Sequence, residues 1–298
     1  MNNQCDGKIL DRVDNYSVIE CKNCNFRHLL PIPTSNELKR FYEKQYYQDH
    51  KPNYIAEDIR DKTYLEITYE ERLQIFSKLT QGRNLLDVGC GAGLFMNFSK
   101  KKGWNVTGIE PSNLAALEAK ELNLEVFEGE LEDFVKLNEL KFDVIYLKNV
   151  LEHVASPEKT LECCKKIMSK EGVLFVEVPN DYQAIQKIAV KILNEPRSWI
   201  SVPDHINYFN YSSLRKLLVR VGFKPVKRTT TYPIYALLMM GYNFISNKEA
   251  GPKAHQKRVN FELFWDKINL RRIKHLIYWF LSALGMGRTV IYYSKREI

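Results

Sequence analysis

The chain has 298 residues, of which 45% are hydrophobic and 27% charged, which excludes a disordered or fibrous polymer and suffices for a full core. Six cysteines in a chain of this length lack the dense spacing of a disulfide scaffold, and the polar beginning lacks the pattern of a secretory signal, so we expect a cytoplasmic protein. The net charge of +8 is uneven, because residues 211–298 hold 17 Lys+Arg against 4 Asp+Glu. This asymmetry indicates either an anionic partner or a solvated basic face that keeps the protein soluble.

From residue 83 onward, short apolar runs alternate with helical patterns, which is typical of a parallel α/β sheet. We expect strands at residues 83–88, 105–109, 124–127, 142–147, 173–178, 223–228 and 289–293. Helices are expected at residues 94–102, 113–122, 156 to just before 172, and 212–221. A cap, a proline at the first helical position and an early acid (Ser156, Pro157, Glu158) mark the start of the third helix.

Two segments lie outside this alternation. Residues 1–80 contain three cysteines and then a Tyr-rich helical stretch around residues 41–47, and we expect them to form an extension apart from a domain at 81–298. Residues 231–287, before the last expected strand, are aromatic and basic. They predict a helical insert that either covers the active site as a lid, which we favour, or contacts an anionic membrane as an amphipathic segment.

The most informative stretch is the run LLDVGCGAG at residues 85–93. An apolar strand leads into glycines at alternate positions, Gly89, Gly91 and Gly93, so backbone N–H groups can approach a ligand closely at the start of a helix. The third glycine comes one position earlier than in the dinucleotide fingerprint G-x-G-x-x-G. The form D-x-G-x-G-x-G, beginning at Asp87, resembles the first motif of class I S-adenosylmethionine-dependent methyltransferases. This resemblance implies that the glycines hold that cofactor and that Asp87 braces the loop.

Two further acids follow expected strands. Glu110 closes the second strand, 17 positions after Gly93, where a carboxylate can accept hydrogen bonds from both ribose hydroxyls of a nucleoside. Pro111 comes next, at a position suited to contact the adenine. By the family resemblance, Glu130 lies near the adenine amino group, with the backbone of Leu131 beside it.

The resemblance reaches about residue 223, through the segments 142–157, 172–180 and 204–209. It implies a doubly wound, seven-stranded, mostly parallel sheet with an antiparallel last strand. The implied activity is methyl transfer from S-adenosylmethionine to a small-molecule, sugar or lipid-linked acceptor by in-line displacement. RNA or other nucleic-acid methylation and non-catalytic S-adenosylmethionine binding are the alternatives. The Asp/Asn-Pro-Pro-aromatic motif and the Pro-Cys nucleophile of two classes of nucleic-acid enzymes are absent, which argues against nucleic acid.

His153 and His205 are the candidate general bases, because histidine accepts a proton near neutral pH and both are expected in loops at the cofactor edge. A purely structural hydrogen bond is the alternative for each. Some quinone-type O-methyltransferases of the family hold a divalent metal with an extra acid and a Glu-His pair. Glu152 and His153 match the pair, but Lys148 and Asn149 stand where the acid would be sought, so metal-assisted catalysis is not expected.

The cysteines near the N-terminus have a separate pattern. Cys21-x-x-Cys24 followed by residues 30–34 resembles an N-terminal extension of many methyltransferases, in which two C-x-x-C pairs form a zinc ribbon. No second cysteine completes a pair around Cys5. Three cysteines with His28 would still make a tetrahedral zinc site, but we expect a degenerate ribbon without metal.

Overall fold

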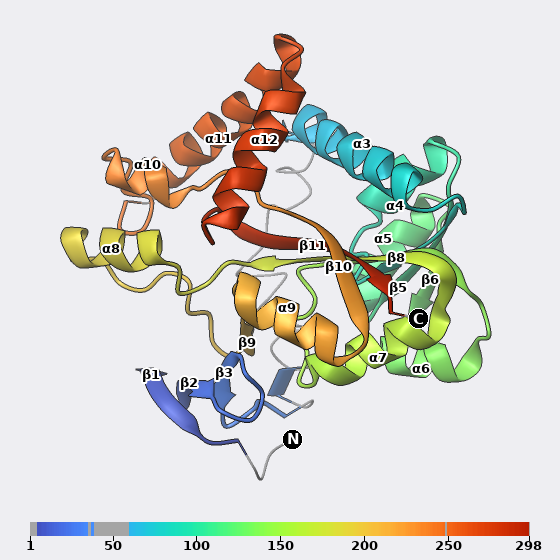
Figure 1. Ribbon diagram of the computed structural model, residues 1–298, viewed down its shortest axis with the longest axis horizontal. Helices are drawn as coiled ribbons and strands as arrows, with labels where there is room; N and C mark the ends of the chain where they lie inside the picture. The colour runs from blue at the N-terminus through green and yellow to red at the C-terminus, as the bar shows by residue number, and fades with distance from the viewer. Residues whose placement is uncertain (1–4, 35–36, 39–59, 248, 298) are drawn as a thin grey trace.

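A seven-stranded sheet forms the centre of the molecule (Figure 1). The computed structural model describes residues 5–34, 37–38, 60–247 and 249–297. In spatial order the strands are β10 (Phe223–Thr229), β11 (Thr289–Arg296), β8 (Met168–Pro179), β7 (Phe142–Lys148), β4 (Asn84–Val88), β5 (Asn105–Glu110) and β6 (Glu125–Glu128). Neighbouring strands from β8 to β6 pair in parallel, and β11 is antiparallel to both of its neighbours. The expected fold class is therefore confirmed.

Helices cover both faces of this sheet, because successive side chains of a strand point to opposite sides. Leu85 packs in one apolar cluster with α3 (Lys62–Leu79) and α4 (Leu94–Lys101). Leu86 packs in the other cluster with α6 (Leu131–Leu137), α7 (Pro157–Ile167) and α9 (Tyr211–Arg220). Helix α5 (Asn113–Glu121) lies on the side of α4, where Ala119 contacts Met96 and Leu124. Both faces are thus buried, as the continuous apolar strands predict.

A second, four-stranded sheet has the order β1-β2-β3-β9. Its first three strands, β1 (Gly7–Val13), β2 (Tyr16–Cys21) and β3 (Arg27–Leu30), come from the N-terminal segment, whereas β9 (Asn207–Tyr208) follows α8 (Ala184–Leu193). Val18 and Leu29 pack with Tyr182, Trp199 and Tyr208 in one core cluster. The extension therefore shares a sheet and a core with later residues, and the domain boundary at residue 80 stays a prediction. The Tyr-rich stretch lies outside the described residues.

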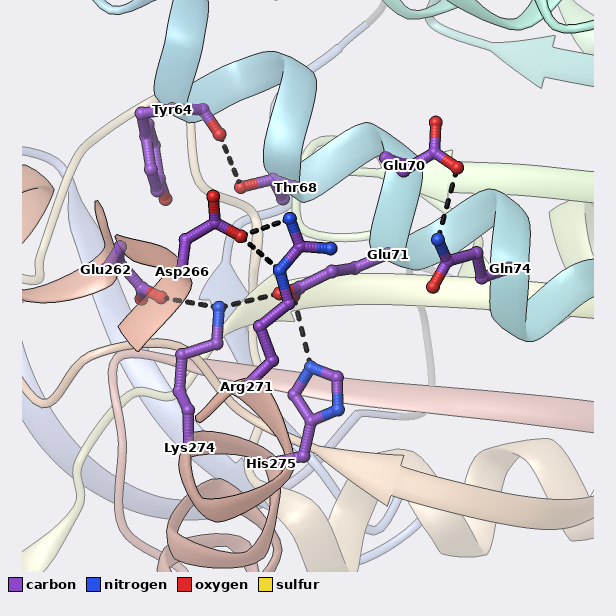
Figure 2. A network of polar contacts seen from close by, with 10 residues as sticks. All are labelled: Tyr64, Thr68, Glu70, Glu71, Gln74, Glu262, Asp266, Arg271, Lys274 and His275. Carbon is purple, nitrogen blue, oxygen red and sulfur yellow. Dashed lines mark hydrogen bonds and ion pairs between the residues drawn. The ribbon is translucent and has the colours of Figure 1, made fainter. Parts of the chain in front are cut away.

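The expected insert lies between β10 and β11 and consists of α10 (Tyr235–Met239), α11 (Ala250–Lys267) and α12 (Arg271–Ala283). Helix α11 lies against α3, and α10 lies against α8 (Figure 1). Figure 2 shows how α12 is attached: Lys274 Nζ lies 2.8 Å from Glu71 Oε1 of α3 and 3.2 Å from Glu262 Oε2 of α11. His275 adds a 3.3 Å contact to Glu71. Among the helices that the structure describes, none is both long and apolar enough to cross a membrane.

Candidate active site

The glycine loop joins β4 to α4 at the carboxyl edge of the sheet. Gly89, Gly91 and Gly93 have φ values of 71°, 55° and 75°, in the left-handed region that favours glycine. A Cβ atom at Gly93 would lie 2.5 Å from Leu124 Cδ1 and 3.0 Å from Ala119 Cβ, so a larger residue would strain the backbone and displace these neighbours. At Gly91 a Cβ atom would meet no described atom within 4 Å. The loop therefore turns tightly and has open space in front of its central residue, as a bound nucleoside requires.

Glu110, at the end of β5, lies directly against this loop. Its side chain is buried, and its two carboxylate oxygens accept hydrogen bonds from the backbone N–H groups of Gly91 and Ser112, at 2.8 and 2.9 Å. Burial raises the pKa of Glu110, and the two backbone hydrogen bonds oppose that rise. An ionised carboxyl group has about four acceptor positions, so the oxygens retain capacity for two ribose hydroxyls.

The other expected cofactor residues surround this pair. Asp87 lies within β4, buried between β5 and β7, and burial raises its pKa to about 8. Pro111 follows Glu110. Glu130 is the residue at which α6 begins. The N–H of the preceding Gly129 donates to the carbonyl oxygen of Glu110 at 3.1 Å. The side chain of Leu131 is buried in the core, so only its backbone could face a ligand. These positions fit S-adenosylmethionine, although the role of each single residue stays a prediction.

The two candidate histidines lie together. The ring centroids of His153 and His205 are 4.9 Å apart at 81°. His153 Nδ1 lies 3.0 Å from Asp204 Oδ1 and 3.0 Å from the Asp204 carbonyl oxygen. Its loop follows β7, which pairs with β4, so it shares the carboxyl edge with the glycine loop. The sequence analysis included Asp204 in the segment 204–209 but did not predict that it contacts His153. The only local sign of a role was its position next to His205.

The charges around His153 make it strongly basic. Burial lowers the pKa of His153, but the hydrogen bond to Asp204 and the charges of Glu152 and Asp204 outweigh this effect and raise it to about 9. Burial also raises the pKa of Glu152 to about 7, against the opposing effect of His153. A carboxylate at Nδ1 fixes the orientation of an imidazole and stabilises its protonated form, which is how a general base is supported.

The loops that carry these residues are tied to each other by backbone contacts. The N–H groups of Ile206 and Asn207 both donate to the carbonyl oxygen of Glu152, at 2.7 and 2.9 Å. The amide nitrogen of the Asn207 side chain donates to the carbonyl oxygens of Leu151 and Val154, at 2.9 and 2.7 Å. Asn207, at the start of β9, therefore fixes the loop of His153 from both ends.

Within the part of the chain that the structure describes, two groups of side chains have the composition of metal sites. Glu152, His153 and His205 offer ligand atoms that all lie within 4.8 Å of one another, and they could hold a divalent cation, so chemistry without a metal stays a prediction. The second group is the one considered in the N-terminal segment, Cys5, Cys21, Cys24 and His28, whose ligand atoms also lie within 4.8 Å of one another.

Fold and site together define a class I S-adenosylmethionine-dependent methyltransferase: a seven-stranded sheet with an antiparallel last strand, a glycine loop and an acid at the end of the second strand. A family described as a methyltransferase domain matches residues 58–228, more than half of the chain. The chain belongs to this family.

Known proteins show the same likeness. The ubiquinone biosynthesis O-methyltransferase of Actinobacillus pleuropneumoniae serotype 7 (strain AP76) is 32% identical over 155 residues, covering 45% of this chain and 66% of that protein. Its counterpart from serotype 5b (strain L20) is 37% identical over 155 residues, with the same coverage. The matched segment thus spans just under two thirds of these relatives.

Solved structures show the fold. A SAM-dependent methyltransferase from Archaeoglobus fulgidus superposes with a TM-score of 0.53 at 17% identity, covering 82% of this chain and 99% of that one. The plantazolicin methyltransferase BamL, solved with a triazolic desmethylPZN analog and SAH, gives a TM-score of 0.56 at 14% identity, covering 88% and 94%.

Proposed function

We propose that this protein transfers the methyl group of S-adenosylmethionine to a hydroxyl oxygen of a small-molecule, sugar or lipid-linked acceptor, with His153 as the general base. The observation that carries the proposal is the Asp204–His153 pair at the edge of the sheet that also holds the glycine loop. The similarity to two ubiquinone biosynthesis O-methyltransferases supports an oxygen acceptor.

S-adenosylmethionine, when bound, supplies a methyl group already activated by its positively charged sulfur. The chain then has to align the acceptor with that methyl group and remove one proton. Glu110 and the glycine loop would bind the nucleoside portion. His153 would take the hydroxyl proton on Nε2, since its Nδ1 is engaged by Asp204, and Asp204 would stabilise the imidazolium that forms. His205, whose ring packs edge-on against His153, would line the acceptor side.

The direct test is a transfer assay with the full-length protein and S-adenosylmethionine labelled on the methyl group. Catechols and phenols with and without an isoprenoid tail, sugar phosphates and an RNA oligonucleotide would serve as acceptors, and mass spectrometry would locate the added methyl group. We expect transfer to an oxygen of a small molecule, and loss of at least 100-fold in kcat in His153→Gln with unchanged affinity for S-adenosylmethionine.

Other outcomes would contradict the proposal. Transfer to RNA alone would favour nucleic-acid methylation. Tight binding of S-adenosylmethionine without consumption on any acceptor, in lysate as well as with the pure compounds, would favour a non-catalytic binding protein. Full activity in His153→Gln would remove His153 from the mechanism and leave alignment as the remaining contribution of the chain.

We further propose that α12 contacts an anionic lipid surface. Ile273, Leu276 and Phe280 are 43%, 63% and 56% exposed and recur at helical spacing, on the side of α12 opposite the buried Lys274 and Tyr278. The excess of basic residues after position 210 complements anionic headgroups. Such contact would suit a lipid-linked acceptor, which has to be collected from a bilayer.

A further inference from the structure

We propose that Cys5, Cys21, Cys24 and His28 bind one zinc ion, and that this ion holds in place the strand pairing that positions the loop of His153. The metal site stands on geometry alone, whereas its effect on the reaction rests on the function proposed above. The sequence left two alternatives for the N-terminal segment, a zinc site and a degenerate ribbon without metal. The geometry points to the zinc site.

The four side chains converge from three different places in the second sheet. Cys5 precedes β1, Cys21 ends β2, Cys24 lies in the turn after it and His28 lies in β3. Their ligand atoms all lie within 4.8 Å of one another. Three sulfurs and one imidazole nitrogen in a tetrahedral arrangement form a common structural zinc site.

The distance between two of the sulfurs fits a shared metal ion. It is too long for a disulfide bond. Cys5 Sγ and Cys24 Sγ are 3.7 Å apart, whereas bonded sulfurs lie about 2.0 Å apart. Two thiolates bound to one zinc ion at about 2.3 Å each, with a tetrahedral angle between them, would lie about 3.8 Å apart. The observed distance therefore equals one edge of a zinc tetrahedron to within a tenth of an ångström.

His28 is oriented as a metal ligand. Its side chain is buried with 2% exposure, and its Nδ1 lies 2.8 Å from the carbonyl oxygen of Leu29. That contact makes Nδ1 the protonated nitrogen and leaves a lone pair on Nε2, which is buried and has no hydrogen-bond partner. Metal-binding histidines commonly donate their second N–H to a carbonyl in this way, and a zinc ion would satisfy the orphaned atom.

The turn between Cys21 and Cys24 supports the same conclusion. The Cys24 N–H donates to Cys21 Sγ at 3.4 Å, and the Asn25 N–H donates to the Cys21 carbonyl oxygen at 3.1 Å. Asn25 takes a left-handed conformation, φ 61°, which closes the turn. Both thiol groups thereby point to the side of the sheet on which His28 lies, and the backbone N–H stabilises a thiolate at Cys21.

The site is connected to the active-site loop by two short steps. His28 pairs with Asn207 across β3 and β9, and the Leu29 N–H donates to the Ile206 carbonyl oxygen at 2.8 Å. Ile206 and Asn207 in turn donate to the carbonyl oxygen of Glu152, next to His153. Because β3 and β9 are four and two residues long, their pairing is weak alone, and a structural zinc ion contributes folding free energy directly.

The metal itself is tested by elemental analysis of the full-length protein purified without chelator. We expect about one zinc ion per chain, and a loss of at least fivefold in Cys24→Ser and in His28→Gln. Cys163→Ser is the matched control, since Cys163 lies in α7, outside the cluster, and its zinc content should stay unchanged. Protein that takes up no zinc even after incubation with Zn²⁺, or variants that keep it, would overturn the site.

The connection is tested by hydrogen exchange before and after zinc removal with a chelator. We expect the amides of Ile206 and Asn207 to exchange at least tenfold faster without zinc, while amides of β4 and β5 and the affinity for S-adenosylmethionine stay within twofold. Unchanged exchange at Ile206 and Asn207 would overturn the positioning role. These readouts need no acceptor, so failure of the proposed methyl transfer would be distinguishable; where transfer occurs, zinc removal should lower kcat.

Discussion

Glu110 is the residue on which cofactor binding depends most directly. The Glu110→Ala variant should bind S-adenosylmethionine at least about 100-fold more weakly, because two hydrogen bonds from ribose hydroxyls to a charged acceptor are lost, each contributing about 1.5–3 kcal/mol. Calorimetry measures the affinity. Glu128→Ala is the matched control, since Glu128 ends the neighbouring strand β6 and is exposed. Unchanged affinity in a folded Glu110→Ala variant would defeat the assignment.

His153 determines the expected pH dependence of the reaction. With a pKa of about 9, roughly one molecule in a hundred has the neutral imidazole at pH 7, and only this form accepts a proton. The value of kcat/KM should therefore rise about tenfold per pH unit from pH 7 and level off near pH 9.

The control for this profile is Asp204→Asn. Removing the charge that holds the imidazolium should move the midpoint of the profile toward the ordinary pKa of histidine and lower the plateau. A flat profile in the wild-type protein, or the same midpoint in Asp204→Asn, would show that His153 is not the base. Addition of Mg²⁺ or Mn²⁺ to the assay would reveal any contribution from a cation at Glu152, His153 and His205.

Local sequence signals found the glycine loop, Glu110 and both histidines, because each belongs to a motif of a few residues. The pairing of Asp204 with His153 joins residues 51 positions apart and depends on how Asn207 ties the two loops together. The convergence of Cys5 with Cys24 and His28 likewise depends on the register of three strands. The sequence offered the three cysteines and His28 as a possible ligand set, but its spacing shows neither that they converge nor that Asp204 meets His153.

At the scale of elements, an ion network joins α11 and α12 of the insert to α3 (Figure 2). Lys274 is 4% exposed and lies between the carboxylates of Glu71 and Glu262. Its replacement in Lys274→Ala leaves the buried Glu262 and the half-buried Glu71 without the cation between them, which should lower the free energy of unfolding by about 3 kcal/mol. Urea denaturation measures this loss, and Lys253→Ala, an exposed lysine on α11, should change stability by less than about 0.5 kcal/mol. Equal effects of the two substitutions would mean that the network is not stabilising.

The exposed side of α12 makes a separate prediction. The protein should sediment with anionic liposomes at low salt and much less with neutral ones, and the pelleted fraction should fall severalfold in the double variant Leu276→Ser, Phe280→Ser. Leu137→Ser on α6 is the control, since Leu137 is 73% exposed but lies on another face. No sedimentation of the wild-type protein at low salt would exclude the lipid contact.

The seven strands of the central sheet could be predicted to within one or two residues at most ends because their apolar runs are bounded by glycines and caps. β8 begins five residues early, at Met168, where an irregular register with β7 extends it. The helices α3 and α8 and the strand β9 were not predicted. Helix α6 and the strands β1 to β3 were not predicted either. These elements are short and half polar, so their stability comes from tertiary packing and from pairing with β9.

At the scale of the whole molecule, the two sheets and the insert meet at one edge. The carboxyl ends of β4, β5 and β7 carry the glycine loop, Glu110 and the loop of His153. The second sheet reaches that edge through β9, and the insert reaches it through its contacts with α3 and α8. The loops that follow parallel strands lie at one edge of their sheet. The central sheet, the second sheet and the insert therefore all contribute residues near this edge.

The position of β11 has a consequence for the order in which the chain assembles. β11 follows the other six strands of the central sheet in the chain, yet it lies between β8 and β10 and is the only described partner of β10. Until it emerges from the ribosome, one edge of β8 has no partner, and its apolar run Val173, Leu174, Phe175 and Val176, all fully buried in the finished protein, remains open to other chains. Newly made molecules should therefore be prone to edge-to-edge aggregation until β11 has been made and has paired with β8.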